Sequence, residues 1–337
     1  MKDIFVIVPT YNPNTKITSN FINDLEKKVN NIIIVNDGCR SEFNDYFKTF
    51  KKHTILTHHV NQGKGRALKT AFNYLLDKHP NFKGAVVADC DGQHSVDDII
   101  KIGKEVLKHP DKLILGTRNF DQKNVPTRSK FGNKMTRGVF KVFIGLNVTD
   151  TQTGLRGYSK KLIPTFMKTK GERYEYETNM LIDCKEKDIP LKEIKIKTIY
   201  IDDNKTSHFN PIKDSIAIYK LFIKYIVSAL SSFLLDILLF SIFLLLTKHI
   251  ILSTILARIL SSTYNFNINK NLIFKKSTKN SMIKYFALVI IQMFVSGYSV
   301  TWLDNILNIS TTLIKVLVDT IIFIINFVIQ REWIFKK

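Results

Sequence analysis

The clearest sign of the fold is the segment Val86-Val87-Ala88-Asp89-Cys90-Asp91-Gly92-Gln93-His94, in which a short apolar run ends in two carboxylates. The strand period of two places Asp89 and Asp91 on one side of the chain if the strand continues through them. Together with the Gln93 carbonyl they make an all-oxygen set suited to Mg²⁺ or Mn²⁺. An isolated Asp-X-Asp is more often a solvated turn, so the interpretation depends on the neighbouring segments.

Short apolar runs alternate with helical patterns through the first 223 residues. The runs are 4–8, 32–35, 85–88 and 113–115, followed by the alternating stretch 193–197. Between them, two sets of apolar residues repeat at helix spacing: Phe21, Leu25 and Val29, and Leu68, Ala71 and Leu75. This order predicts βαβ units and a mainly parallel sheet. In such sheets ligands lie at the carboxyl ends of the strands.

Polar residues follow the first two runs, at the edge where ligands are expected. Pro9-Thr10-Tyr11-Asn12 follows the first run, and Asn36-Asp37-Gly38 follows the second. Asp37 can accept hydrogen bonds from a nucleobase or ribose, and Tyr11 can stack on a base. Either feature alone is weak, because turns are rich in Asp-Gly.

A glycine-containing segment, Asn61-Gln62-Gly63-Lys64-Gly65-Arg66, opens the second helical pattern. Its two glycines permit close backbone approach, and Lys64 and Arg66 near a helix N-terminus suit a phosphate. The spacing differs from a Walker loop, which needs Gly-Lys followed by Ser or Thr. Taken alone, such a segment is more often an ordinary helix start.

Further charged groups follow the later runs. Gly116-Thr117-Arg118 places a cation at another strand end, and the segment 150–156 contributes Asp150 and Arg156. The segment 171–177 adds three carboxylates at an expected helix start. A charged helix face with an acidic first turn would also account for most of these.

Composition divides the chain into a soluble half and a membrane half. Residues 224–337 carry 12 Lys and Arg but 4 Asp and Glu, and most of the remainder is apolar. This excludes a fully soluble enzyme, a disordered protein and a disulfide-rich secreted domain. The three scattered cysteines suit a reducing compartment.

Four apolar segments predict an all-α domain with four transmembrane helices. They lie at about 225–247, 250–268, 285–303 and 313–329. As a helix the first is about 34 Å long, enough to cross a hydrocarbon core of roughly 30 Å. Lys and Arg gather between the second and third segments and after the fourth. This bias predicts a multi-pass protein of the cytoplasmic membrane, with both termini and the soluble half in the cytoplasm.

Three charges fall inside these segments: Asp236, Arg258 and Asp319. Because charge within a membrane is expensive, they are expected to face the bundle interior and to pair. They could form a polar path or lipid-headgroup site, or an ion pair that only holds the bundle together.

Two basic amphipathic stretches precede the first membrane segment. In residues 128–146, Lys130, Lys134 and Arg137 recur at helical spacing beside apolar residues, a pattern typical of a helix on an anionic membrane surface. A core-facing helix with a solvated back is the alternative. Residues 211–224 predict a juxtamembrane helix. The net charge of +21 fits anionic lipids better than nucleic acid, since no recognition motif is present.

The ordered motifs resemble the family 2 glycosyltransferases, in particular the dolichol/polyprenyl-phosphate sugar synthases. They are Pro9-Thr10-Tyr11, Asn36-Asp37-Gly38, Asn61 to Gly65, Asp89 to Gln93, Gly116-Thr117-Arg118, Asp150 to Arg156 and Arg173 to Glu177. The membrane half, with the segments 258–266 and 326–335, is similar to the GtrA family. The resemblance implies a Rossmann-like GT-A domain over 1–210 and a GtrA-like domain over 225–337. It also implies inverting transfer of one sugar from a nucleotide-sugar to polyprenyl phosphate at the cytoplasmic leaflet.

The resemblance further implies roles for individual residues. The nucleoside would be held by Pro9, Tyr11 and Asp37, and the metal and donor by Asp89, Asp91 and Gln93. The candidate phosphate-binding cations are Arg118, Arg128 and Lys205, and Lys64 is a further substrate-binding candidate. The catalytic candidates are Asp91 and Asp150. A phosphate monoester is already anionic at neutral pH, so Asp150 could position groups as readily as act as a base.

The donor and the acceptor follow from two further observations. Pro13 stands where eukaryotic-type mannosyl synthases tend to have Glu, which favours a UDP-hexose or UDP-N-acetylhexosamine over GDP-mannose. The high Lys, Ile and Asn content indicates an AT-rich bacterial genome, and hence undecaprenyl phosphate and cell-envelope glycosylation.

Two other functions would use parts of the same pattern. A processive polysaccharide synthase would need a Gln-X-X-Arg-Trp element, which residues 150–223 lack. A lipid-linked-sugar flippase or membrane scaffold with a nucleotide-sugar-binding domain is the alternative from a different class. A homo-oligomer is compatible with either.

Overall fold

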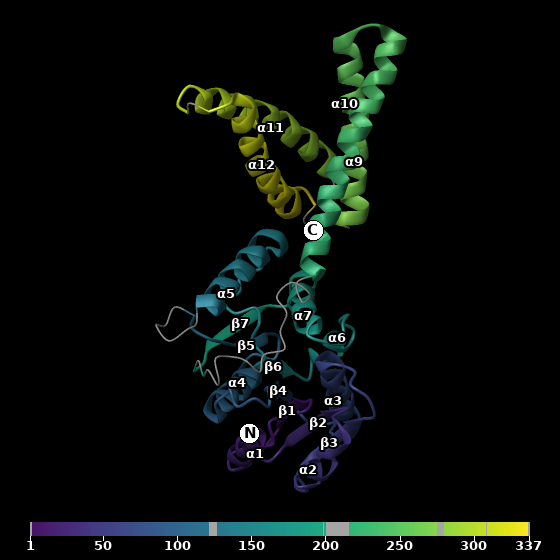
Figure 1. Cartoon of the computed structure of the whole chain (residues 1–337). Coiled ribbons are helices and arrows are strands. Elements are labelled where there is room, and N and C mark those ends of the chain that lie inside the picture. Colours follow the sequence, from purple (N-terminus) through teal and green to yellow (C-terminus); the bar gives the residue numbers. More distant parts are fainter. Residues whose placement is uncertain are drawn as a thin grey trace. The chain divides into compact units, whose positions relative to one another are not determined.

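The computed structural model describes residues 2–120, 127–197, 199, 216–274, 280–307 and 309–335 (Figure 1). The chain divides into two compact units, residues 1–217 and 218–337. The boundary falls within the expected juxtamembrane stretch 211–224, of which residues 211–215 lie outside the described residues.

The first unit is built on a seven-stranded sheet with the order β3-β2-β1-β4-β6-β5-β7. The strands are β1 Ile4–Thr10, β2 Ile32–Asp37, β3 Thr54–His58, β4 Gly84–Val87, β5 Leu113–Thr117, β6 Arg156–Ser159 and β7 Leu191–Lys195. Neighbouring strands are parallel except for β6, which runs antiparallel to both β4 and β5. The expected α/β fold with a mainly parallel sheet is confirmed, and β3 and β6 are strands that the apolar runs did not reveal.

Helices of the first unit connect these strands. They are α1 Thr15–Glu26, α2 Asn44–Lys48, α3 Lys64–Lys78, α4 Val96–Lys108, α5 Thr127–Val139, α6 Ile163–Met167 and α7 Glu175–Glu186. Two of them begin at side-chain caps: Asn14 Oδ1 accepts the Ile17 N–H at 3.2 Å, and Ser95 Oγ accepts the Asp98 N–H at 3.2 Å. In α4 the two acidic residues of the first turn add a favourable interaction with the helix dipole.

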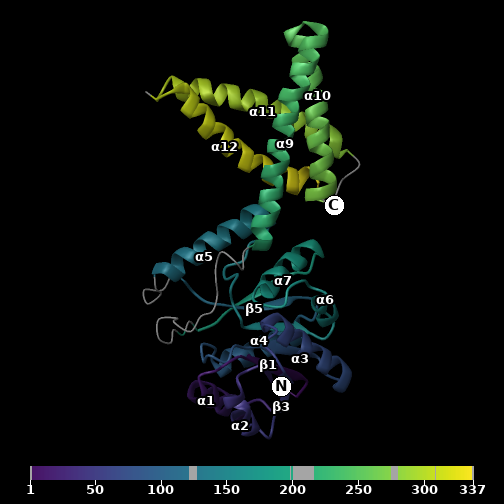
Figure 2. The ribbon, with the colours of Figure 1, turned by 45° about the vertical axis from the view of Figure 1, so that its right-hand side comes forward.

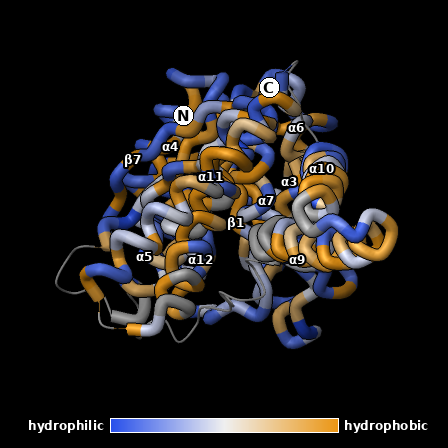
Figure 3. Tube along the Cα trace, turned by 90° about the horizontal axis from the view of Figure 1, so that it is seen from above, coloured by the Kyte–Doolittle hydropathy of each residue, from blue (hydrophilic) through white to orange (hydrophobic). Residues whose placement is uncertain are grey.

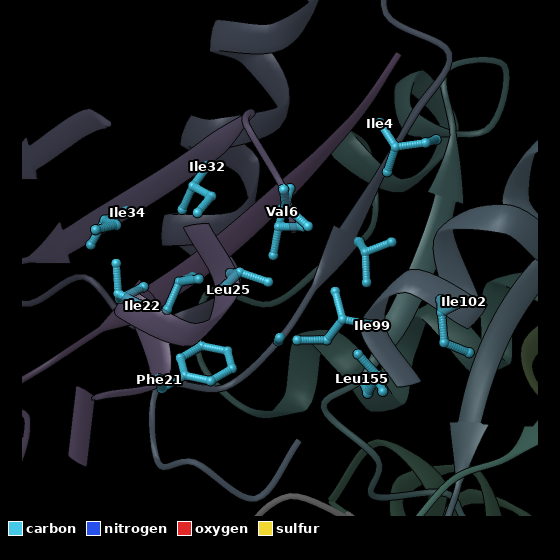
Figure 4. Close-up of a cluster of buried hydrophobic side chains, with 14 of the residues drawn as sticks. Ile4, Val6, Phe21, Ile22, Leu25, Ile32, Ile34, Ile99, Ile102 and Leu155 are labelled. Atoms are coloured by element: carbon cyan, nitrogen blue, oxygen red, sulfur yellow. The ribbon is translucent and has the colours of Figure 1, made fainter. Parts of the chain in front are cut away.

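An apolar core fills the space between the sheet and the helices α1 and α4 (Figure 4). Ile4 and Val6 of β1 belong to the same cluster as Ile22 and Leu25 of α1, and all four are fully buried. Because side chains alternate along a strand, Phe5 and Ile7 point to the opposite face of the sheet. Burial on both faces explains why the central strands read as continuous apolar runs. Polar residues are thereby left to the carboxyl ends of the strands.

The described residues of the second unit form helices and their short connections, as expected. It contains α9 Ile216–Thr247, which starts at the unit boundary, and then α10 Ile250–Ile268, α11 Ser281–Asp304 and α12 Thr311–Ile329. Among the described residues, Ile223–Thr247 and Ser281–Asp304 are long and apolar enough to cross a membrane. Both α9 and α11 are mostly orange in Figure 3. Crossing by all four helices stays a prediction.

Two of the three charges expected within the membrane pair with each other. Arg258 Nη2 lies 3.3 Å from Asp236 Oδ2, and Ser261 Oγ donates to Asp236 Oδ1 at 2.7 Å. The Arg258 side chain is nevertheless 60% exposed within the chain, so it lies at the edge of the helix pair and not in its interior. Asp319 accepts a hydrogen bond of 2.6 Å from Ser296 Oγ.

Candidate functional site at the carboxyl ends of the strands

Asp89 follows β4 and lies beside two basic side chains. Its Oδ1 is 2.7 Å from Lys64 Nζ, and its Oδ2 is 3.5 Å from His94 Nε2. Burial alone would raise the pKa of Asp89, but the neighbouring Lys64 ammonium and His94 outweigh burial and hold this pKa far below its usual range. Asp89 is therefore an anion at neutral pH.

Lys64 is the first residue of α3 and connects the end of β4 with α7. Its ammonium also lies 3.0 Å from Glu177 Oε2, and its side chain is nearly buried. Burial alone would lower the pKa of Lys64, but Asp89 and Glu177 together raise it well above its ordinary value. Lys64 therefore carries a permanent positive charge between two carboxylates.

Asp91 is the second carboxylate of this strand end. Its Oδ1 accepts the Gln93 N–H at 3.0 Å. Burial and then the charge of Asp89 raise the pKa of Asp91, so the pair of carboxylates repel each other. A cation bound between them would relieve this repulsion.

A divalent metal fits the chemistry of this strand end only in part. Asp89 and Asp91 supply the oxygen ligands that Mg²⁺ and Mn²⁺ prefer, and the buried His94 has no hydrogen-bond partner at Nδ1 among the described residues. No group of three or more His, Cys, Asp or Glu side chains within the described ranges could hold a metal alone. Protein groups would thus fill part of the coordination shell and leave the rest to a ligand.

The loop after Asp150 packs its backbone against Asp89. A Cβ added at Gly154 would lie 2.0 Å from Asp89 Oδ2, so only glycine leaves room for this carboxylate. The loop is also fixed to β5, because Thr153 Oγ1 donates to the Gly116 carbonyl. The sequence motifs 89–93 and 150–156 are therefore neighbours in space.

Asp150 is fully buried and holds Arg118 at the carboxyl end of β5. Arg118 Nε lies 2.8 Å from Asp150 Oδ2 and its Nη2 lies 3.1 Å from Oδ1, a bidentate pair. The Arg118 and Gln152 N–H groups also donate to this carboxylate, at 3.2 and 3.1 Å. With four donors in place, Asp150 is arranged to orient Arg118.

Asp37 is saturated in a similar way by groups of the chain itself. Its Oδ1 lies 2.7 Å from His58 Nδ1 and accepts the Gln62 N–H at 3.0 Å. Its Oδ2 accepts the Gly63 N–H and the Asn61 amide, both at 2.8 Å. Asp37 thus shapes the loop that leads into α3, and its contact with a nucleoside stays a prediction.

Nearby, Tyr11 follows β1 and is 47% exposed, whereas Pro9 is buried in the strand. The Tyr11 ring is therefore accessible to a planar ligand. The stacking role expected from the sequence stays a prediction.

The glycines before and within α3 permit close packing against residues 172–176. Gly63 has φ +100, and a Cβ there would lie 2.5 Å from the Glu172 carbonyl oxygen. A Cβ at Gly65 would lie 2.6 Å from Tyr176 Cβ. The Arg66 N–H donates to the Glu172 carbonyl at 2.9 Å. The close approach that the sequence suggested for a phosphate is thus used by the protein's own backbone.

Comparisons with known proteins decide the family. The profile of Glycosyl transferase family 2 matches residues 5–166, and that of GtrA/DPMS, transmembrane domain, matches residues 224–335. An uncharacterised protein of Methanocaldococcus jannaschii is 32% identical over 232 residues, which cover 66% of this chain and 93% of the relative. The chain belongs to glycosyl transferase family 2. Its resemblance to that family and to GtrA proteins is confirmed.

Two further proteins are similar to this glycosyltransferase. The UDP-N-acetylglucosamine–dolichyl-phosphate N-acetylglucosaminyltransferase of Methanococcus voltae is 30% identical over 222 residues, covering 60% of this chain and 87% of the relative. The solved structure of Mycobacterium tuberculosis glucosyl-3-phosphoglycerate synthase, bound to Mn²⁺, UDP and glucosyl-3-phosphoglycerate, has a TM-score of 0.47 at 15% identity. The matched region covers 66% of this chain and 77% of the synthase chain.

Two buried residues of this glycosyltransferase have structural roles that the sequence motifs do not predict. Arg156 is fully buried and donates to the Thr153 and Glu177 carbonyls at 2.9 and 2.7 Å, so it fixes the loop and α7 and is not a surface cation. His58 bridges Asp37 and Thr70, with Nε2 2.9 Å from Thr70 Oγ1. In the sequence, the sign of this role is that His58 stands at the end of a strand, but the apolar runs do not predict β3.

Two of the remaining expected site residues, the Arg128 side chain and Lys205, lie outside the described residues.

Helix α5 exposes large apolar side chains next to cations. Phe131 and Met135 are 66% and 51% exposed and lie beside the exposed Lys130 and Lys134. Large apolar side chains exposed among lysines are typical of a helix that contacts a membrane surface.

Proposed function

We propose that the protein is a membrane-bound, inverting glycosyltransferase that moves one sugar from a nucleotide-sugar to polyprenyl phosphate at the cytoplasmic leaflet. The observation that carries the proposal is the fusion of a family 2 domain to a GtrA/DPMS domain in one chain. The donor would be a UDP-hexose or UDP-N-acetylhexosamine. Pro13 and the name of the Methanococcus voltae relative both favour this over GDP-mannose.

The end of β4 supports donor binding. Asp89 and Asp91, with Gln93, would hold Mg²⁺ or Mn²⁺, which would neutralise the charge that develops on the departing nucleoside diphosphate. Lys64 keeps Asp89 ionised and in place at 2.7 Å. Tyr11, exposed beyond β1, would stack on the base of the donor.

The end of β5 supports binding of a phosphate group. Asp150 holds the Arg118 guanidinium in one orientation, and the ring of Phe120, 5.0 Å away, supports it on one face. An oriented guanidinium suits the planar arrangement of phosphate oxygens. Since the lipid phosphate would attack as an anion, the site needs an oriented cation more than a strong general base.

Two surfaces support action at a membrane. The exposed Phe131 and Met135 of α5 would enter the headgroup region of the cytoplasmic leaflet, with Lys130 and Lys134 on anionic lipids. The apolar stretch Ile223–Thr247 of α9 would anchor the chain. The lipid acceptor would then meet the donor at the bilayer surface.

The test is an assay of nucleoside diphosphate release by the purified full chain. The reaction would contain undecaprenyl phosphate, Mg²⁺ or Mn²⁺ and one of a panel of UDP- and GDP-sugars, each with and without the lipid. We expect release with a UDP-sugar that requires the lipid and disappears with EDTA. Folded protein that releases nothing with any donor would refute the proposal and point to the binding or flipping role.

A further inference from the structure

The second unit contains two copies of one sequence pattern. Ile223-Lys224-Tyr225 before the first long apolar stretch recurs as Ile283-Lys284-Tyr285. The segment 265–274 recurs as 326–335, and both read Asn-Phe-X-Ile-(Asn or Gln)-(Lys or Arg)-X-X-Ile-Phe. Each copy therefore begins with the same three residues and ends with the same ten-residue pattern.

The same repeat is present in the backbone. Both α10 and α12 have 19 residues, and each continues into a five-residue π turn, Asn269–Ile273 and Gln330–Ile334. Each π turn is closed by a 2.8 Å bond, from the Phe274 N–H to the Asn269 carbonyl and from the Phe335 N–H to the Gln330 carbonyl. The two helical hairpins, α9 with α10 and α11 with α12, can be followed in Figure 2.

Each copy reaches into the other with its tyrosine. The Tyr225 hydroxyl accepts a hydrogen bond of 3.3 Å from the Asn326 amide of the second copy. The Tyr285 hydroxyl donates a bond of 2.7 Å to Asn265 Oδ1 of the first copy. Because Tyr225 corresponds to Tyr285 and Asn265 to Asn326, these are the same contact made in both directions.

Equivalent residues also meet each other directly. Asn269 Nδ2 donates to Gln330 Oε1 at 2.9 Å, and the rings of Phe274 and Phe335 stack at 5.0 Å with an interplanar angle of 14°. The crosswise ring pairs Phe266 with Phe335 and Phe274 with Phe327 both have centroids 5.7 Å apart. Self-pairing of equivalent positions, flanked by reciprocal pairs, is the pattern of an isologous two-fold interface.

We infer that the second unit is a fused dimer of one hairpin, residues 223–274 and 283–335, and that the inner face of each hairpin is an interaction surface fitted to the other copy. Asn269 and Gln330 are 0% and 2% exposed, and the Gln330 amide bonds to Asn269 and to the Tyr225 hydroxyl of the first hairpin, so without that hairpin it would lose both partners in an apolar environment. Polar groups of this kind fix one register and orientation between helices that apolar packing alone leaves open. The second hairpin thereby holds the hairpin that continues the first unit.

Contacts within each hairpin obey the same repeat. Asp236 and Arg258 pair across the first hairpin, and the corresponding Ser296 and Asp319 pair across the second. The carboxylate of the pair lies on α9 in the first hairpin, whereas in the second hairpin it lies on α12. The two positions in contact are nevertheless the same in both hairpins.

Cations also repeat at matching positions of the two hairpins. Lys270 lies 5.9 Å from the ring centre of Phe266, and Arg331 lies 5.9 Å from the ring centre of Phe327. Cations at matching ends indicate that both hairpins enter the membrane from the same side.

An exchange of the two central amides tests the inference in the full chain. Asn269→Gln would place two long side chains face to face, Gln330→Asn two short ones, and the double variant would restore the combined length. Both tryptophans, Trp302 and Trp333, belong to the second hairpin, so tryptophan fluorescence in detergent follows unfolding of this unit alone. Each single variant should lower the midpoint temperature by roughly 2–4 °C, and the double variant should regain at least half of the summed loss.

The matched control is Asn267→Gln, the same change at an exposed position of α10. It should leave the midpoint unchanged. Losses that simply add in the double variant, or a control that loses as much as Asn269→Gln, would overturn the inference.

Cross-linking provides a second measurement should a single variant fail to fold. Phe274→Cys with Phe335→Cys should form an intramolecular disulfide under mild oxidation in native membranes, seen as faster migration on a gel. Leu246→Cys, at a 74% exposed position far along α9, combined with Phe335→Cys is the comparison pair. Equal cross-linking of both pairs, or none at Phe274 and Phe335, would contradict the two-fold contact.

Discussion

The ends of β2 and β4 carry aspartates in similar positions but in opposite states. Asp37 accepts hydrogen bonds from two backbone N–H groups and an amide and pairs with His58, all within 3.0 Å. Asp89 pairs with Lys64 at 2.7 Å, but its charge and burial raise the pKa of the neighbouring Asp91, and the Nδ1 of His94 has no hydrogen-bond partner among the described residues. The first strand end is complete without a ligand, whereas Asp91 at the second keeps a charge that a ligand would balance.

This difference separates structural carboxylates from ligand-binding ones better than residue type does. A carboxylate whose lone pairs are filled by its own chain contributes to stability and is costly to remove. A carboxylate that repels its neighbour contributes little to stability and is available for binding. Substitutions at the two strand ends should therefore affect different properties.

The largest effect is expected at Asp91. Asp91→Ala should lower the rate of sugar transfer by about 1000-fold or more, because a cation that binds the diphosphate would lose a ligand. Its stability should change by less than about 1 kcal/mol, since burial and Asp89 already disfavour the charge. Nucleoside diphosphate release and thermal unfolding measure the two properties. Asp97→Ala, at an exposed position early in α4, is the control, and near wild-type turnover of Asp91→Ala would disprove the metal assignment.

The opposite pattern is expected at Asp37. Asp37→Ala would leave the N–H groups of Gln62 and Gly63 without their acceptor and should cost about 3–5 kcal/mol of unfolding free energy. Urea unfolding followed by circular dichroism would measure this loss, with the exposed Asp45→Ala as control. If Asp37→Ala were as stable as the wild type but inactive, the end of β2 would be a ligand site like that of β4.

Asp150 tests whether saturation also excludes a role as general base. Asp150→Asn keeps one oxygen for Arg118 but loses the charge, so transfer should fall by about 10- to 100-fold and not vanish. Initial rates at saturating donor would show this, and Asp188→Asn, at an exposed position with φ +53 that asparagine tolerates, serves as control. A loss as large as that of Asp91→Ala would show that the carboxylate takes part in the chemistry.

Sequence patterns located the strand ends but not the state of their side chains. The apolar runs of β1, β2, β4 and β5 reveal themselves because both faces of these strands are buried. The sequence does not predict β3, because this strand lies at the edge of the sheet and most of its residues are only half-buried, which weakens the apolar pattern. β6 escaped because it has four residues and begins with a buried arginine.

The partners of each carboxylate were hidden for a different reason. Asp37 is saturated by residues 58–63, and Asp150 by Arg118, which follows another strand. Such donors come together only once the strand order and the loop paths are fixed. A sequence motif can therefore name a strand-end aspartate without showing whether it is already occupied.

Gly154 offers a steric test of the open strand end. Gly154→Ala would place a methyl group 2.0 Å from Asp89 Oδ2, so the carboxylate or the loop must move. We expect a loss of about 1–3 kcal/mol in stability together with a clear fall in transfer rate. At Gly132 in α5 an added Cβ meets nothing within 4 Å, so Gly132→Ala should stabilise the chain by about 0.5–1 kcal/mol. A fully active Gly154→Ala would show that the exact position of Asp89 is unimportant.

The smallest effect concerns Glu105 of α4, a carboxylate saturated by lysines instead of by neutral donors. Lys192 first, at 2.7 Å, and then Lys108, at 3.1 Å, lower the pKa of Glu105 to about 2. The pKa of Glu105 is lower in the folded chain than in the unfolded chain. The interaction of Glu105 with the two lysines therefore stabilises the protein above about pH 4.5, and this contribution is lost as the pH falls towards 2. Glu105→Gln should therefore cost about 1 kcal/mol at pH 7 and progressively less between pH 5 and pH 3. Urea unfolding of both proteins across this range would measure the difference. A difference that does not change with pH would mean that Glu105 acts through packing. The lysines around Glu105 would then contribute less to the free energy of unfolding than the neutral donors contribute at Asp37.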